Sequence, residues 1–78
     1  MDSSGTIEYW TKMIERHPKE AEYYFERGRL HYRNNDFGEA INDFNRALEL
    51  DPGHTAARQM WEMAQAIFNF RNFDLYNP

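Results

Sequence analysis

The stretch NNDFGEAINDFNRALELDP, residues 34–52, decides the fold of this chain. Its apolar residues recur mostly at steps of three and four, which is the spacing of a single stripe along a helix: Phe37, Ile41, Phe44, Ala47, Leu48 and Leu50. Asp36, with Glu39 three residues later, predicts a capping box at the start of this helix. Pro52 predicts its end, because the residue before a proline is pushed out of helical geometry. The stretch therefore predicts a helix over residues 37–50.

A weaker copy of the second half of this stretch lies earlier in the chain. When positions 7–18 are aligned with positions 41–52, seven of the twelve are identical or chemically alike, and Ile7, Glu15 and Pro18 are the identities. A fixed period of this size is typical of stacked helical arrays. The copy predicts a helix over residues 6–17, ended by Pro18.

Two further helices are expected on either side of residues 37–50. Residues 19–34 contain no proline, and their one glycine, Gly28, falls in the middle. A glycine inside a helix costs roughly 1 kcal/mol relative to alanine, so we expect a neighbouring helix to approach closely there. Residues 55–70 are expected to form a helix with Thr55 as its cap. They carry the strongest helical stripe of the chain: Ala57, Met60, Trp61, Ala64, Ile67 and Phe68.

Composition indicates one small soluble domain. The 78 residues include 41% hydrophobic and 28% charged residues, no cysteine and a net charge of −4. No apolar run is long enough to span a bilayer, and no basic cluster is present. We therefore expect a cytoplasmic protein that binds neither nucleic acid nor membranes. We expect residues 1–5 to be a disordered leader, residues 6–70 to be the domain, and residues 71–78 to be an aromatic tail.

The polar residues form no recognisable catalytic or metal-binding pattern. His17, His31 and His54 show no i, i+4 spacing, and the four glycines are scattered rather than grouped into a phosphate-binding loop. Asp43 and Glu49 are expected to lie on a solvated helix face. We therefore predict no enzyme activity, cofactor or metal.

The centre of the chain resembles the tetratricopeptide repeat, a short helix–turn–helix unit. The family's pattern positions are occupied by Tyr24, Arg27, Gly28, His31, Ala40, Phe44 and Pro52, and the phrases DFGEAI and ALELDP are similar to the family's. One full repeat over residues 21–54 is thus indicated, with half a repeat on each side. The resemblance implies an all-α, antiparallel helix–turn–helix superhelix of about four helices.

Three residues depart from the family's pattern. Arg27 stands in place of a leucine and His31 in place of a tyrosine, and we expect both to pack their carbon stems while their polar ends reach water. Glu62 stands where the next copy of the repeat would carry the counterpart of Gly28, so the close approach at Gly28 is not repeated. The last helix is therefore expected to be a terminal cap rather than a standard repeat helix.

The resemblance also implies a binding function. Partners of this family usually lie in a concave groove, whose positions in this chain would be Glu22, Phe25, Arg29, Tyr32 and Arg33, continued in the last helix by Ala56, Gln59, Met63, Ala66 and Ile67. The lysine–asparagine clamp that some relatives use for chaperone peptides is replaced by Phe25 and Arg29. We expect a protein or peptide partner with an acidic or aromatic element. In the alternative interpretation, Arg29 and Arg33 only pair with Glu22 and Glu26 along the helix.

A structural or self-associating protein is the second hypothesis. Four helices are equivalent to about two repeats, which is fewer than the three usually needed for a stable array. A second copy of the chain could therefore cover the last helix. Monomer and homodimer both stay open. The residues that would make a self-association contact are Trp61, Phe68, Phe70, Phe73 and Tyr76.

Overall fold

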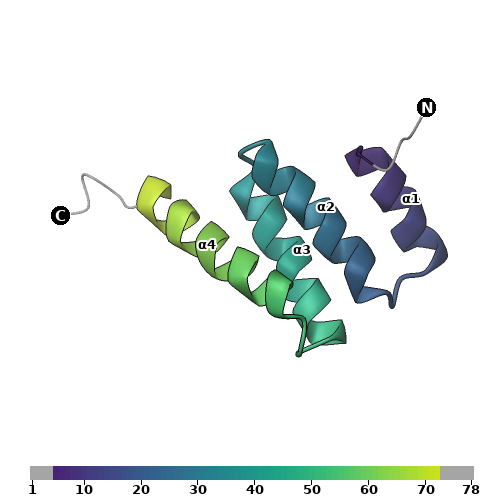
Figure 1. Cartoon of the computed structure of the whole chain (residues 1–78). Helices are drawn as coiled ribbons and strands as arrows, with labels where there is room; N and C mark the ends of the chain where they lie inside the picture. The colour runs from purple at the N-terminus through teal and green to yellow at the C-terminus, as the bar shows by residue number, and fades with distance from the viewer. Residues whose placement is uncertain (1–4, 73–78) are drawn as a thin grey trace.

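Four helices, each packed on the next, make up the computed structural model of the chain, which describes residues 5–72 (Figure 1). They are α1 (Ile7–Arg16), α2 (Ala21–Arg33), α3 (Phe37–Leu50) and α4 (Thr55–Asn72). Neighbouring helices run antiparallel in one continuous layer, and no strand occurs within the described residues (Figure 1). The predicted all-α, helix–turn–helix architecture is confirmed.

The core is built mainly by α2, α3 and α4, includes Ile14 of α1, and is centred on the fully buried ring of Phe44. Four alanines with no exposed surface let the helix axes approach one another: Ala40 and Ala47 in α3, and Ala57 and Ala64 in α4. Aromatic rings fill the space between them, and Phe25 packs on Phe44 with the ring centroids 6.0 Å apart. This combination of small and large side chains buries apolar surface within a thin layer of helices, and this burial is the main favourable contribution to its folding.

Gly28 lies at the closest approach of α2 and α3, as its position inside a helix predicts. A Cβ atom added to Gly28 would lie 2.7 Å from Cε1 of Phe44 and 3.0 Å from Cβ of Asp43. The expected close approach of a neighbouring helix is therefore confirmed, and α3 is that helix.

The helix ends are capped differently from the sequence prediction. The Asp36 side chain makes no capping hydrogen bond, so the predicted capping box of α3 is wrong. Instead, Asn35 adopts a left-handed conformation (φ 67°), and the Asp36 amide donates to the carbonyl of His31. This tight turn closes the end of α2. Asp36 remains the N-cap residue of α3, and its carbonyl accepts the Ala40 amide, but its side chain accepts no amide of the first turn.

The cap of α4 is also not the predicted one. Thr55 is already a helical residue, and the acceptor for the Ala57 amide is Nδ1 of His54 at 3.0 Å. An imidazole nitrogen therefore satisfies the amide that a threonine hydroxyl was expected to satisfy.

Candidate functional site

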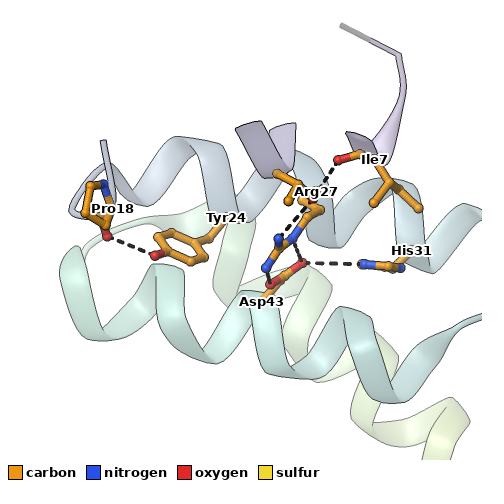
Figure 2. Close-up of polar contacts among 7 residues, drawn as sticks. Ile7, Pro18, Tyr24, Arg27, His31 and Asp43 are labelled. Atoms are coloured by element: carbon orange, nitrogen blue, oxygen red, sulfur yellow. Dashed lines mark hydrogen bonds and ion pairs between the residues drawn. The ribbon is translucent and has the colours of Figure 1, made fainter. Parts of the chain in front are cut away.

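A buried ion pair joins α2 to α3 in the middle of the molecule (Figure 2). Nε of Arg27 donates to Oδ2 of Asp43, and Nη2 donates to Oδ1, both at 2.8 Å. The Asp43 side chain is only 7% exposed. The hydrogen bond from Arg27 to Asp43 raises the pKa of the guanidinium above its ordinary value, although burial opposes this shift. The predictions that Arg27 reaches water and that Asp43 lies on a solvated face are therefore wrong.

The same cluster extends to α1 and along α2. Nη1 of Arg27 donates to the hydroxyl of Thr11 at 3.2 Å, and that hydroxyl donates to the carbonyl of Ile7 at 2.9 Å. Nε2 of His31 lies 3.9 Å from Oδ2 of Asp43, so the polar end of His31 also points inward rather than to water. Figure 2 shows Arg27 between Asp43 and the start of α1. The cluster links three helices; its carboxylate lies inside the molecule, and its guanidinium belongs to a side chain that is partly exposed.

A second polar contact fixes α4 relative to α2. Besides capping α4, the ring of His54 stacks on Phe25 with centroids 4.7 Å apart, and its Nε2 lies 2.9 Å from Oε1 of Glu22. Because Nδ1 accepts the Ala57 amide, this geometry places the ring proton on Nε2, which donates to the carboxylate of Glu22. His54 therefore joins the central repeat to the helix that follows it.

The residues predicted from α2 to line a groove separate into two groups. Glu22, Arg29 and Arg33 lie at the surface, whereas Phe25 is buried against Phe44 and His54. Tyr32 is half-buried and meets the Phe37 ring edge-on, with centroids 5.2 Å apart. Phe25 and Tyr32 thus support the surface from below, and the charged residues are its outer layer.

The residues predicted from α4 form an exposed stripe with one exception. Ala56, Gln59, Met63 and Ala66 are exposed, and Ile67 is half-buried against the core. Phe70, seven residues after Met63, extends the same side of the helix; the two side chains are 81% and 51% exposed. We name the surface residues together the α2–α4 face: Glu22, Arg29, Arg33, Ala56, Gln59, Met63, Ala66 and Phe70.

Charges on the α2–α4 face are partly compensated. Nη2 and Nε of Arg29 donate to Oε1 of Glu26 at 2.8 and 3.2 Å, which agrees with the alternative interpretation for this arginine. Glu22 pairs with His54 instead. No hydrogen bond or ion pair of the Arg33 side chain is found among residues 5–72. The Arg33 guanidinium is thus the uncompensated cation of the α2 part of this face.

Three surface depressions have linings that, apart from Gln59, do not belong to the α2–α4 face. One of about 300 Å³ lies beside the start of α4 and is lined by Pro52, Gly53, Thr55, Arg58, Gln59 and Glu62. The other two, of about 460 and 420 Å³, lie on either side of the Phe68 ring, between the start of α3 and the end of α4. None of these three is lined by the groove residues predicted from α2.

The residues predicted for self-association are divided between core and surface. Trp61 is half-buried and packs against the core, whereas Phe68 is 38% exposed and Phe70 is the most exposed large apolar residue among those described. Phe73 and Tyr76 lie outside the described residues. Over residues 5–72, no group of three or more histidine, aspartate or glutamate side chains is arranged to hold a metal ion. No helix of that range combines the length and hydropathy needed to cross a membrane.

Comparison with known proteins identifies the repeat in the centre of the chain. Residues 21–54 match the tetratricopeptide repeat. The chain is 31% identical over 67 residues to a protein named serine/threonine-protein phosphatase T from Aspergillus oryzae, covering 85% of this chain. It is 42% identical over 51 residues to a protein named SGT1 homolog from Oryza sativa subsp. japonica, covering 65% of this chain.

The chain spans only 14% of the length of each of these two relatives. No solved structure gives a significant match. Tetratricopeptide repeats generally mediate interactions between proteins and are generally not catalytic. The matched segment, the antiparallel helices and the close contact at Gly28 agree, and residues 21–54 of this chain therefore form a tetratricopeptide repeat.

Proposed function

We propose that this chain is a non-catalytic binding module that takes a protein or peptide segment along its α2–α4 face. The proposal rests on one observation, the combination of exposed arginines on α2 with the exposed apolar stripe of α4. A segment that carries acidic and aromatic residues fits this combination best. Its carboxylates would pair with the guanidinium groups, and its rings would cover the apolar stripe.

The apolar stripe supplies most of the attraction in this proposal. Covering Met63 and Phe70 would remove on the order of 200 Å² of apolar surface from water, which contributes roughly 5 kcal/mol by area alone. Association and side-chain ordering oppose this gain. Arg33 would add charge-assisted hydrogen bonds at little cost, because it gives up no partner among the described residues. We therefore expect weak binding by the stripe alone and selective binding when acidic groups are added.

The test starts with a displayed library of random peptides selected on the immobilised chain. Selected peptides are expected to be enriched in aspartate or glutamate together with phenylalanine or tryptophan. Their affinities are then measured by fluorescence anisotropy for the wild-type chain and two variants. Arg29→Glu/Arg33→Glu and Met63→Glu should each weaken binding by about tenfold or more, because each removes one half of the proposed recognition.

Arg46→Glu is the control for charge reversal elsewhere on the molecule, because Arg46 is an exposed arginine of α3 that pairs with Glu49 outside this face. It should leave the affinity close to that of the wild type. An equal loss in the control would show attraction by overall charge instead of by the α2–α4 face. Unchanged binding in both face variants would reject the proposal.

A further inference from the structure

The ring of Phe68 separates two depressions of opposite charge at the end of α4. On one side, a depression of about 420 Å³ is lined by Asn35, Phe37, Gly38, Phe68 and Arg71. On the other side, one of about 460 Å³ is lined by Asp36, Gly38, Glu39, Ile41, Asn42 and Phe68. They share Gly38 and Phe68, so they form one continuous surface. We name this surface the Phe68 patch.

The charged groups of the Phe68 patch form no ion pair within the described part of the chain. Arg71 lies over the Phe37 ring, with its guanidinium carbon 5.4 Å from the centroid. No carboxylate of residues 5–72 lies within ion-pair distance of Arg71, and none of their cations lies within ion-pair distance of Asp36 or Glu39. The patch thus carries one positive charge on one side of the ring and two negative charges on the other.

The floor of the patch is low because Gly38 has no side chain. A Cβ atom added there would lie 3.5 Å from Cε1 of Phe68, which is ordinary contact. The Phe68 ring is 38% exposed and stands beside this floor. A surface with an apolar centre and opposite charges on its two sides is complementary to itself across a two-fold axis.

From this arrangement we propose that the Phe68 patch is the contact of a homodimer with two-fold symmetry, independent of the α2–α4 face. In the dimer, Arg71 of each copy faces Asp36 and Glu39 of the other copy, and the two Phe68 rings meet near the axis. The patch is small, so the dimer is weak and reversible. Charge complementarity favours a second copy over an unrelated acidic or basic partner, since either of those would meet like charges on one side.

Stacking of further repeat helices on α4 fits the structure less well. The close packing of α2 on α3 needs a glycine, because a Cβ atom at Gly28 would lie 2.7 Å from the ring of Phe44. The residue of α4 that corresponds to Gly28 in the repeat is Glu62. A helix placed on α4 as α3 is placed on α2 would meet this side chain. A contact through the Phe68 patch avoids it.

The test is sedimentation equilibrium of the full 78-residue chain in a concentration series at low salt. The wild type should show a monomer–dimer equilibrium. Arg71→Glu should raise the dimer dissociation constant by roughly tenfold to thirtyfold, because the symmetric interface loses two attractions and gains two repulsions. Asp36→Lys/Glu39→Lys should have a similar effect. Arg58→Glu, the same charge change elsewhere on α4, is the control and should leave the constant unchanged.

The decisive measurement is an equimolar mixture of the two charge-reversed variants. In a mixed dimer, each substituted side faces an opposite charge, so association should return to near the wild-type level. Circular dichroism of each variant checks that the helices are intact. A monomer at every concentration, as expected if residues 73–78 of the same chain cover the patch, would overturn the proposal. A dimer that Arg71→Glu does not weaken, or that the mixture does not restore, would overturn it as well.

Discussion

Arg27→Leu should destabilise this chain more than Asp43→Ala, which removes the ion-pair partner of Arg27. Leucine is the residue that the family's pattern places at position 27. The substitution leaves the Asp43 carboxylate, 7% exposed, without either of its 2.8 Å hydrogen bonds from the guanidinium. Stranding a buried charge in this way costs about 3 kcal/mol or more. Asp43→Ala strands Arg27 instead, but that side chain is 22% exposed and can turn to water, so we expect a loss of about 1–2 kcal/mol.

The double variant Arg27→Leu/Asp43→Ala removes both charges and should lose only about 0–1 kcal/mol. The sum of the two single losses thus exceeds the loss in the double variant by about 3–5 kcal/mol, which is the expected coupling between the two residues. Urea unfolding followed by circular dichroism gives the free energy of unfolding of all four proteins. In thermal unfolding, Arg27→Leu alone should lower the melting temperature by about 12–24 °C. Additive effects, or a smaller loss for Arg27→Leu than for Asp43→Ala, would refute the reasoning that desolvation of Asp43 dominates this pair.

Three further substitutions test the packing and the caps. Gly28→Ala should lower the free energy of unfolding by about 1–2 kcal/mol in urea titrations, because overpacking against Phe44 exceeds the gain in helix propensity. His54→Ala should cost about 1–2 kcal/mol, whereas His54→Asn should recover part of this loss, and hydrogen exchange of the Ala57 amide should report the restored cap. Met63→Glu should leave the melting temperature within about 2 °C of wild type, because Met63 is an exposed residue.

The sequence was sufficient to predict the helices because their apolar residues repeat with helical spacing. The stripe of α3 agrees with its buried side chains, including Phe37, Phe44 and Ala47. Gly28 was informative for a different reason: a glycine inside a helix is unfavourable, so its presence indicated a close contact that the structure shows. Both inferences depend on local spacing and on steric size, which can be read from a single sequence.

The direction of polar side chains could not be read in the same way. Arg27 and Asp43 are far apart in the chain, and each on its own is more stable in water than in a core. Only their bidentate contact makes burial acceptable, and this contact depends on the packing of α2 on α3. A signal was nevertheless present in the sequence. Arg27 directly precedes Gly28 and Asp43 directly precedes Phe44, and the helices meet at Gly28 and Phe44.

His54 was missed because its role depends on two separate elements. Histidine is uncommon as a helix cap, and the nearby Thr55 offered a more usual choice. The structure favours His54 because its ring can also stack on Phe25 and donate to Glu22, both in α2. A cap that forms a tertiary contact at the same time cannot be identified from the composition of one helix end.

The two proposals place different surfaces of α4 in contact with different partners. Met63 and Phe70 lie two helical turns apart on one side of the helix, whereas Phe68 and Arg71 line the depression beside α3. Peptide binding should therefore be lost in Met63→Glu and kept in Arg71→Glu, and dimer formation should show the reverse. Loss of both properties in a single variant would mean that peptide and second copy compete for one surface, and the separation of the two faces would then be wrong.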